Sequence, residues 1–125
     1  MFVRETKDAW QIVLQPDHGD LAGQLVRAWS PRPEPLASLE LLARRHDDGW
    51  AVWERAPALD DEGRPQNFLD VPVSTHLAFY RAGIAALSDQ DPYAGLLLSM
   101  HGAGIYTGRY GTQPELQLTF ADEAR

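Results

Sequence analysis

Apolar and polar positions along the chain predict a short hairpin followed by four helices. Two stretches that contain apolar residues, 2–5 and 9–14, flank the polar triplet at 6–8, as in two short strands joined by a turn. Further along, apolar residues recur every three or four positions, which indicates amphipathic helices. The predicted helices span about residues 18–29, 36–46, 75–88 and 92–106. The expected fold class is mainly α, a helical bundle with a short N-terminal β-hairpin.

Capping residues and prolines set the expected helix ends. Asp17, Ser74 and Asp91 are the expected N-caps, because their side chains can accept hydrogen bonds from free amides of a first helical turn. Three prolines within residues 30–35 separate the first two helices. Residues 47–70 lack a helical period and are expected to form an irregular loop held on apolar surface by tryptophans.

The chain length and composition change this picture by limiting the class of protein. The chain has 125 residues, which fits one domain over residues 1–125 with a single core. It carries 11 Lys and Arg against 18 Asp and Glu, so its net charge of −7 argues against a nucleic-acid partner. No stretch approaches the roughly 20 apolar residues of a membrane span, and we expect a cytoplasmic protein with no membrane contact. The absence of cysteine excludes thiol nucleophiles and thiolate metal ligands.

The four histidines fall one to each predicted helix, at His18, His46, His76 and His101. His46 is followed directly by Asp47, so an imidazole and a carboxylate leave the end of one helix together. Helices joined by loops of these lengths can bring the four histidines to one level of a bundle, where facing helices build metal sites. The four histidines and Asp47 are therefore candidate ligands of a divalent metal ion.

This pattern of residues resembles the HD-domain metal-dependent phosphohydrolase superfamily. The shared features are an early histidine, His18, the doublet His46-Asp47, and two later histidines, His76 and His101. The resemblance implies an HD-like bundle in which His18, His46 and Asp47 bind one ion. It also implies that Asp47 bridges to a second ion held by His76 and His101. The implied cofactors are one or two divalent ions of Fe, Mn, Zn, Co or Ni.

Longer strings resemble an uncharacterised bacterial family of unknown function. They are Gln15-Pro16-Asp17-His18, His46-Asp47-Asp48-Gly49-Trp50, Asn67-Phe68-Leu69-Asp70 and the segment 91–102. This resemblance covers residues 1 to about 111 and implies no activity of its own. The last HD ligand is an aspartate on a later helix, for which Asp122 is the candidate here. Members of the closer family are longer, which implies a C-terminally truncated HD-like domain.

The expected function is hydrolysis of a phosphate ester or phosphoanhydride by metal-activated water. Asp48, beside the doublet, is the candidate to orient or deprotonate that water, and Arg44, Arg45 or Arg109 could contact the phosphate. The expected partner is a small phosphorylated molecule. Apolar surface left by missing C-terminal helices would favour a homodimer.

Two other functions stay open. A site rich in histidine and carboxylate on this fold also resembles inositol oxygenase, which uses two iron ions to activate dioxygen. Alternatively, the histidines belong to a non-catalytic module that binds a metal or ligand without turnover. A serine hydrolase is not expected, because the chain has no Gly-x-Ser-x-Gly motif.

Overall fold

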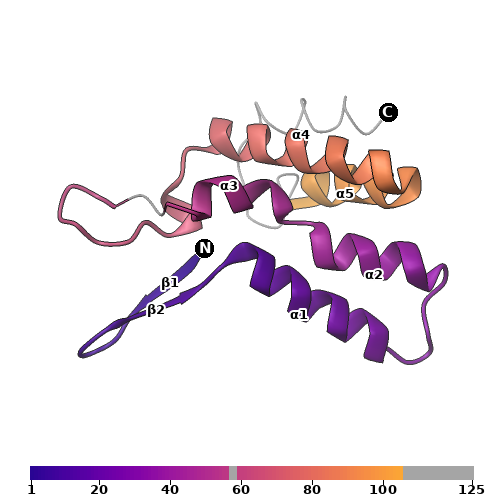
Figure 1. Ribbon diagram of the computed structural model, residues 1–125, viewed down its shortest axis with the longest axis horizontal. Coiled ribbons are helices and arrows are strands. Elements are labelled where there is room, and N and C mark those ends of the chain that lie inside the picture. The colour runs from indigo at the N-terminus through magenta and orange to yellow at the C-terminus, as the bar shows by residue number, and fades with distance from the viewer. Residues whose placement is uncertain (57–58, 106–125) are drawn as a thin grey trace.

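The computed structural model describes residues 1–56 and 59–105. Its elements in chain order are β1 (Phe2–Glu5), β2 (Trp10–Val13), α1 (Gln15–Ala28), α2 (Leu36–Arg45), the 3₁₀ turn η1 (Asp48–Trp50), α3 (Ala51–Glu54), the 3₁₀ turn η2 (Phe68–Asp70), α4 (Val73–Gln90) and α5 (Pro92–Gly104). The predicted class, mainly α with an N-terminal hairpin, is confirmed (Figure 1). Within the described ranges, no helix combines the length and apolar character needed to cross a membrane.

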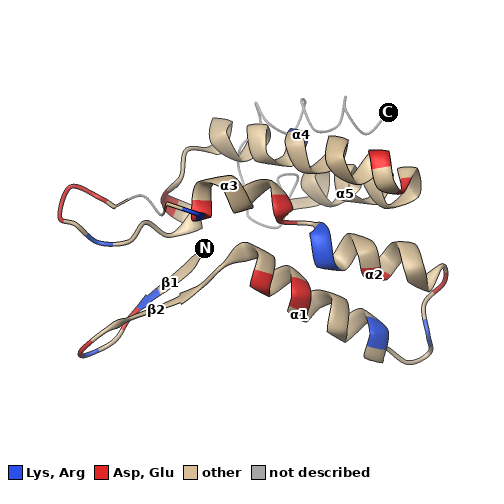
Figure 2. Ribbon diagram, in the orientation of Figure 1, with Lys and Arg blue, Asp and Glu red and all other residues tan. Residues whose placement is uncertain are grey.

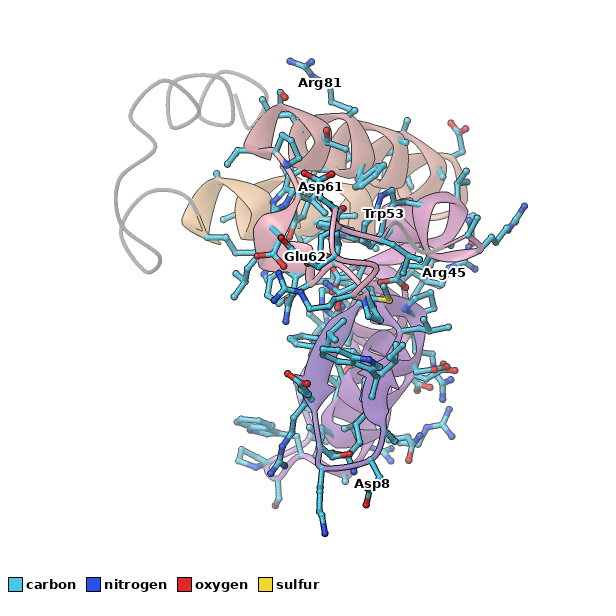
Figure 3. The ribbon with its side chains drawn as sticks, turned by 90° about the vertical axis from the view of Figure 1, so that its left-hand side faces the viewer. Asp8, Arg45, Trp53, Asp61, Glu62 and Arg81 are labelled. Atoms are coloured by element: carbon cyan, nitrogen blue, oxygen red, sulfur yellow. The ribbon has the colours of Figure 1, made fainter. Side chains whose placement is uncertain are left out.

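The hairpin pairs antiparallel strands β1 and β2 where the sequence predicted it. Phe2 lies opposite Val13 at the open end of the hairpin. Thr6 closes the turn, because its hydroxyl donates to the carbonyl of Ala9 at 2.7 Å. Asp8 marks this turn in Figure 3, which shows the hairpin extending away from α4. The open end, with Phe2, therefore lies toward the helices.

The predicted N-caps of the first and third helices are wrong, because both helices begin earlier than expected. α1 begins at Gln15 with Pro16 at its second position, so Asp17 lies inside the first turn. Proline fits a first helical turn, where its missing amide has no partner to lose, and this lets the helix start upstream of the acid. α4 begins at Val73, so Ser74 also lies inside its first turn.

The predicted cap of α5 and the predicted end of α2 are confirmed. The Asp91 carboxylate accepts hydrogen bonds from the amides of Tyr93 at 2.9 Å and Ala94 at 3.2 Å. α2 ends at Arg45, and His46 is its C-cap. The start of α5 and the end of α2 could be predicted from the sequence because helix ends depend on residues that are neighbours in the chain.

The expectation of an irregular loop over residues 47–70 is wrong in part, because η1, α3 and η2 are short helical turns within it. Trp50 is 4% exposed, and its ring centre lies 4.8 Å from that of Phe79 on α4. Asn67 and Asp70 close η2 with reciprocal hydrogen bonds between side chain and backbone. The segment is thus ordered by tertiary contacts rather than by helical periodicity.

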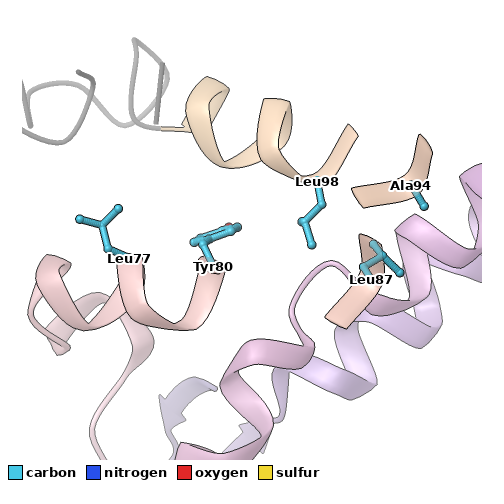
Figure 4. Packing of buried hydrophobic residues seen from close by; sticks show 5 residues of the cluster. All are labelled: Leu77, Tyr80, Leu87, Ala94 and Leu98. Carbon is cyan, nitrogen blue, oxygen red and sulfur yellow. The ribbon is translucent and has the colours of Figure 1, made fainter. Parts of the chain in front are cut away.

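The core lies between α4 and α5. Leu77, Tyr80 and Leu87 of α4 pack with Ala94 and Leu98 of α5 (Figure 4). α1 packs against α2, and η1 packs against α4, so the end of α2 lies between the two helix pairs. This arrangement places the residues after α2 next to both α1 and α4.

Two glycines allow the close approaches that fix this position. A Cβ on Gly19 would lie 2.4 Å from the carbonyl oxygen of Arg44, so the backbones of α1 and α2 nearly touch there. A Cβ on Gly49 would lie 2.1 Å from the carbonyl oxygen of Phe79, so η1 lies directly on α4. The short segment between α2 and η1 is held from both sides.

Candidate metal centre

The structure brings His18 of α1 together with His46 and Asp47 at the end of α2. One donor atom from each of the three residues lies within 4.8 Å of the other two. Asp47 Oδ2 is 3.2 Å from His46 Nε2 and 4.0 Å from His18 Nε2. No other group of three such donors occurs in residues 1–56 and 59–105. Two imidazole nitrogens and one carboxylate oxygen suit zinc and other first-row divalent ions.

The hydrogen bonds of His46 orient its ring toward Asp47. His46 Nδ1 donates to the carbonyl of Ala43 at 2.8 Å, which leaves Nε2 as the nitrogen that faces the carboxylate. Burial alone would lower the pKa of His46. The hydrogen bond between His46 and Asp47 and the negative charge of Asp47 outweigh burial, so the pKa of His46 is raised. Asp47 is 7% exposed, and a buried carboxylate needs a compensating cation. A protonated His46 or a bound metal ion can supply that positive charge.

His101 of α5 lies beside the same group. Its ring centre lies 5.3 Å from that of His46 and 6.4 Å from that of Tyr80. Desolvation by the surrounding protein lowers the pKa of His101, and the neighbouring His46 lowers it further. His101 is not one of the three clustered donors, but a neutral imidazole there can accept a proton or a hydrogen bond within the site.

His76 of α4 is held in a different way. It is 7% exposed, its Nε2 donates to the carbonyl of Phe68 at 3.1 Å, and its ring centre lies 4.7 Å from that of Trp50. Burial lowers the pKa of His76, although hydrogen bonds to the backbone of Phe68 and Val71 act in the opposite direction. One ring nitrogen of His76 is therefore used to hold η2 on α4.

All four histidines and Asp47 line one cavity of about 600 Å³. The other walls come from the hairpin, η1, η2, α4 and α5, and are mostly apolar. They include Phe2, Trp50, Phe68, Leu69, Val71, Val73, Tyr80 and Ile105. The three clustered donors thus open into a space large enough for a small organic molecule.

Asp48, Arg44 and Arg45, which were expected to assist catalysis, are not among the residues that line this cavity. The Asp48 carboxylate pairs with Arg45, and Arg44 pairs with Asp20 at 2.9 Å and with Glu40 at 3.1 Å. Figure 3 shows Arg45 extending from the edge of the molecule. Two further candidates lie outside the described residues, Arg109 and Asp122.

Gln15 is a cavity residue that the sequence analysis missed. It is 3% exposed, and its backbone amide donates to the Glu54 carboxylate at 2.8 Å. Its side-chain oxygen has no hydrogen-bond partner among the described residues. Its spacing from His18 could have indicated this position, because a residue three positions before His18 on a helix lies on the same face as His18.

The fold and the site define a mainly helical protein in which two histidines and an aspartate lie close enough together to hold a divalent metal ion. The chain belongs to the family described as "Protein of unknown function (DUF3891)", which matches residues 1–125. No curated protein and no solved structure matches it. The expected membership of an uncharacterised family is confirmed.

Proposed function

We propose that this protein is a divalent-metal-dependent hydrolase of a phosphate ester or phosphoanhydride. The observation that carries the proposal is the group formed by His18, His46 and Asp47, whose donor atoms lie within 4.8 Å of one another at the edge of a cavity. These three residues would hold the ion. A bound ion of this kind polarises a phosphoryl oxygen and makes water acidic enough to react near neutral pH. The resemblance to the HD superfamily supports hydrolysis.

The chain's own residues prepare the site for that chemistry. The carbonyl of Ala43 fixes the ring of His46, so Nε2 stays turned to Asp47. Burial of Asp47 strengthens its attraction to a cation, because little water competes for the carboxylate. The apolar walls around the group favour a substrate over bulk water.

His101 is the residue best placed to exchange a proton with the substrate or with water. It lines the cavity beside His46, and a neutral imidazole at this position can accept a proton. Asp48, to which the sequence analysis gave this role, pairs with Arg45 outside the cavity lining. We therefore assign the proton transfer to His101.

A second candidate function is oxygen activation at iron. Two histidines and one carboxylate are also the ligand set of mononuclear non-haem Fe(II) oxygenases. The resemblance to inositol oxygenase favours the same metal. An iron-dependent absorption band together with oxygen uptake would identify this function, and a metal-binding module without turnover would show neither.

The proposal is tested by metal content and phosphatase activity of protein without a histidine tag. After reconstitution with zinc or manganese, we expect about one equivalent of metal in the wild type. His46→Ala and Asp47→Asn should lose the metal together with hydrolysis of p-nitrophenyl phosphate. Circular dichroism checks that both variants are folded.

Asp48→Asn and His76→Gln are the matched controls. Each changes an acid or a histidine near the site but outside the three clustered donors, so each should keep the metal. A wild type with two equivalents of metal, one of which is lost in His76→Gln, would show that two ions are bound, as the HD pattern implies. Full metal binding by the His46→Ala variant, or no metal in the reconstituted wild type, would overturn the proposal.

A further inference from the structure

The walls of the cavity suit an apolar group. Phe2 and Phe68 meet edge to face with ring centres 4.9 Å apart, and Trp50 lies 6.3 Å from Phe68. Tyr80 and Ile105 complete the lining toward α5. Aromatic walls of this kind bind an aromatic or branched aliphatic body by area and ring contacts. The part of the substrate that lies in the cavity is therefore apolar.

The charges around the cavity argue against a polyphosphate. No Lys or Arg occurs among the described residues that line it. Two arginines near the end of α2, Arg44 and Arg45, are already held by Asp20, Glu40 and Asp48. Figure 2 shows the basic residues spread over the hairpin, the helix ends and the loops rather than gathered at one place. A single ion could balance one phosphate group beside Asp47, but not a chain of them.

Gln15 suggests that the substrate carries one polar group. Its side-chain oxygen is buried in the lining of the cavity and meets no donor among the described residues. A buried acceptor without a partner costs stability, which a ligand hydroxyl or amino group would recover once the side-chain amide turns its oxygen into the cavity. The substrate should carry one such donor on its apolar body.

Gly104 leaves room at the α5 side of the cavity. A Cβ there would meet no described heavy atom within 4 Å, although the residue lines the cavity. The total volume of about 600 Å³ fits a single-ring compound with a phosphate group rather than a macromolecule.

We propose that the substrate is a phosphate monoester of an aromatic or branched apolar alcohol that carries one hydroxyl or amino group facing Gln15. This proposal rests on the proposed function and adds the substrate class to it. Hydrolysis joins the water oxygen to phosphorus and breaks the bond between phosphorus and the alcohol oxygen. The alcohol leaves with a proton, and inorganic phosphate is the other product.

The first experiment uses the metal-free protein, so it does not depend on the metal site. Resorcinol, a neutral ring with two hydroxyl groups, is titrated while the indole NMR signals of the tryptophans are followed. We expect the Trp50 signal to shift and that of Trp29, which is 66% exposed at the end of α1, to stay unchanged. No shift of the Trp50 signal, or equal shifts of both, would overturn the substrate class.

The second experiment compares phosphonates on the metal-loaded protein by calorimetry. We expect phenylphosphonate to bind about tenfold more tightly than methylphosphonate, because the ring is buried. A hydroxyl at the meta position should strengthen binding by roughly threefold to tenfold. Pyrophosphate binding as tightly as phenylphosphonate would contradict the proposal.

Two variants locate the effects. Gln15→Met keeps the side-chain length, so it should remove the preference for the meta hydroxyl. Gly104→Leu should fill the cavity and abolish resorcinol binding while the metal stoichiometry stays the same, and Gly104→Ala is its control. If resorcinol binds but no metal does, the proposed hydrolase function is wrong, whereas binding of an apolar ring in the cavity is supported. If metal binds but resorcinol does not, only the substrate class fails.

Discussion

His76 shows how one residue can combine structural and chemical roles. Its ring lies among Trp50, Phe68 and the backbone of η2, at 7% exposure, and one ring nitrogen donates to the Phe68 carbonyl. The charged form of an imidazole is disfavoured there, because water is largely excluded. The ring therefore holds η2 against α4 in its neutral form.

This predicts the sign of a pH effect on stability. Burial keeps the pKa of His76 in the folded protein below its usual 6.5, so the unfolded chain binds more protons as the pH falls below that value. When the pH falls from 7.5 to 5.5, His76 should lower the free energy of unfolding, so the change in this free energy should be more unfavourable in the wild type than in His76→Gln. Urea unfolding of both proteins at the two pH values measures the difference. Equal changes in the two proteins would show that His76 does not contribute.

At the scale of elements, the site depends on two backbone contacts. Gly19 lets α1 touch the end of α2, and Gly49 lets η1 touch α4. Asp47 lies two residues before Gly49, directly between these contacts. The orientation of its carboxylate toward His18 is therefore set by how the helices approach one another.

Gly49→Ala should disturb this arrangement. The new Cβ would lie 2.1 Å from the Phe79 carbonyl oxygen, so η1 must move away from α4. We expect a loss of about 1–3 kcal/mol in the free energy of unfolding, measured with urea, together with weaker metal binding.

Gly83→Ala is the control for this change, because it adds the same methyl group in the middle of α4. The nearest atoms would be 3.7–3.9 Å away, which is ordinary contact. Its stability should stay the same or rise by about 0.5–1 kcal/mol, since alanine favours helix. Gly49→Ala with wild-type stability would mean that η1 does not lie on α4 as described.

At the scale of the whole molecule, a bound ion would connect segments that are distant in the sequence. His18 belongs to α1, whereas His46 and Asp47 follow α2, and the 27 residues between the two histidines include the proline-rich connection. An ion held by all three residues exists only when α1 and α2 are packed together. Metal binding should therefore stabilise the fold as a unit.

The expected result is a rise in Tm on adding metal. At a free metal concentration about a hundredfold above Kd, the stabilisation is about 2.7 kcal/mol, which corresponds to a Tm increase on the order of 10 °C for a domain of this size. Differential scanning fluorimetry with zinc or manganese measures the shift. Asp48→Asn should keep the increase and His46→Ala should lose it. An equal increase in His46→Ala would place the metal elsewhere.

The amino-acid sequence by itself determined the features that depend on neighbouring residues. The hairpin, the end of α2 before His46 and the cap of Asp91 on α5 follow from alternation, helical period and hydrogen bonding within a few positions. The pair His46-Asp47 was evident for the same reason, because the two side chains are adjacent in the chain.

Only the tertiary structure decided which of the candidate residues meet. Helical periodicity shows which residues share one face of a helix, but not which other segment packs against that face. The sequence therefore did not distinguish the role of His18, which lies beside Asp47, from that of His76, which holds η2. The ordered turns within 47–70 and the place of Gln15 in the cavity likewise depend on packing between distant segments. The burial that perturbs the pKa of His46 and His76 arises only from that packing.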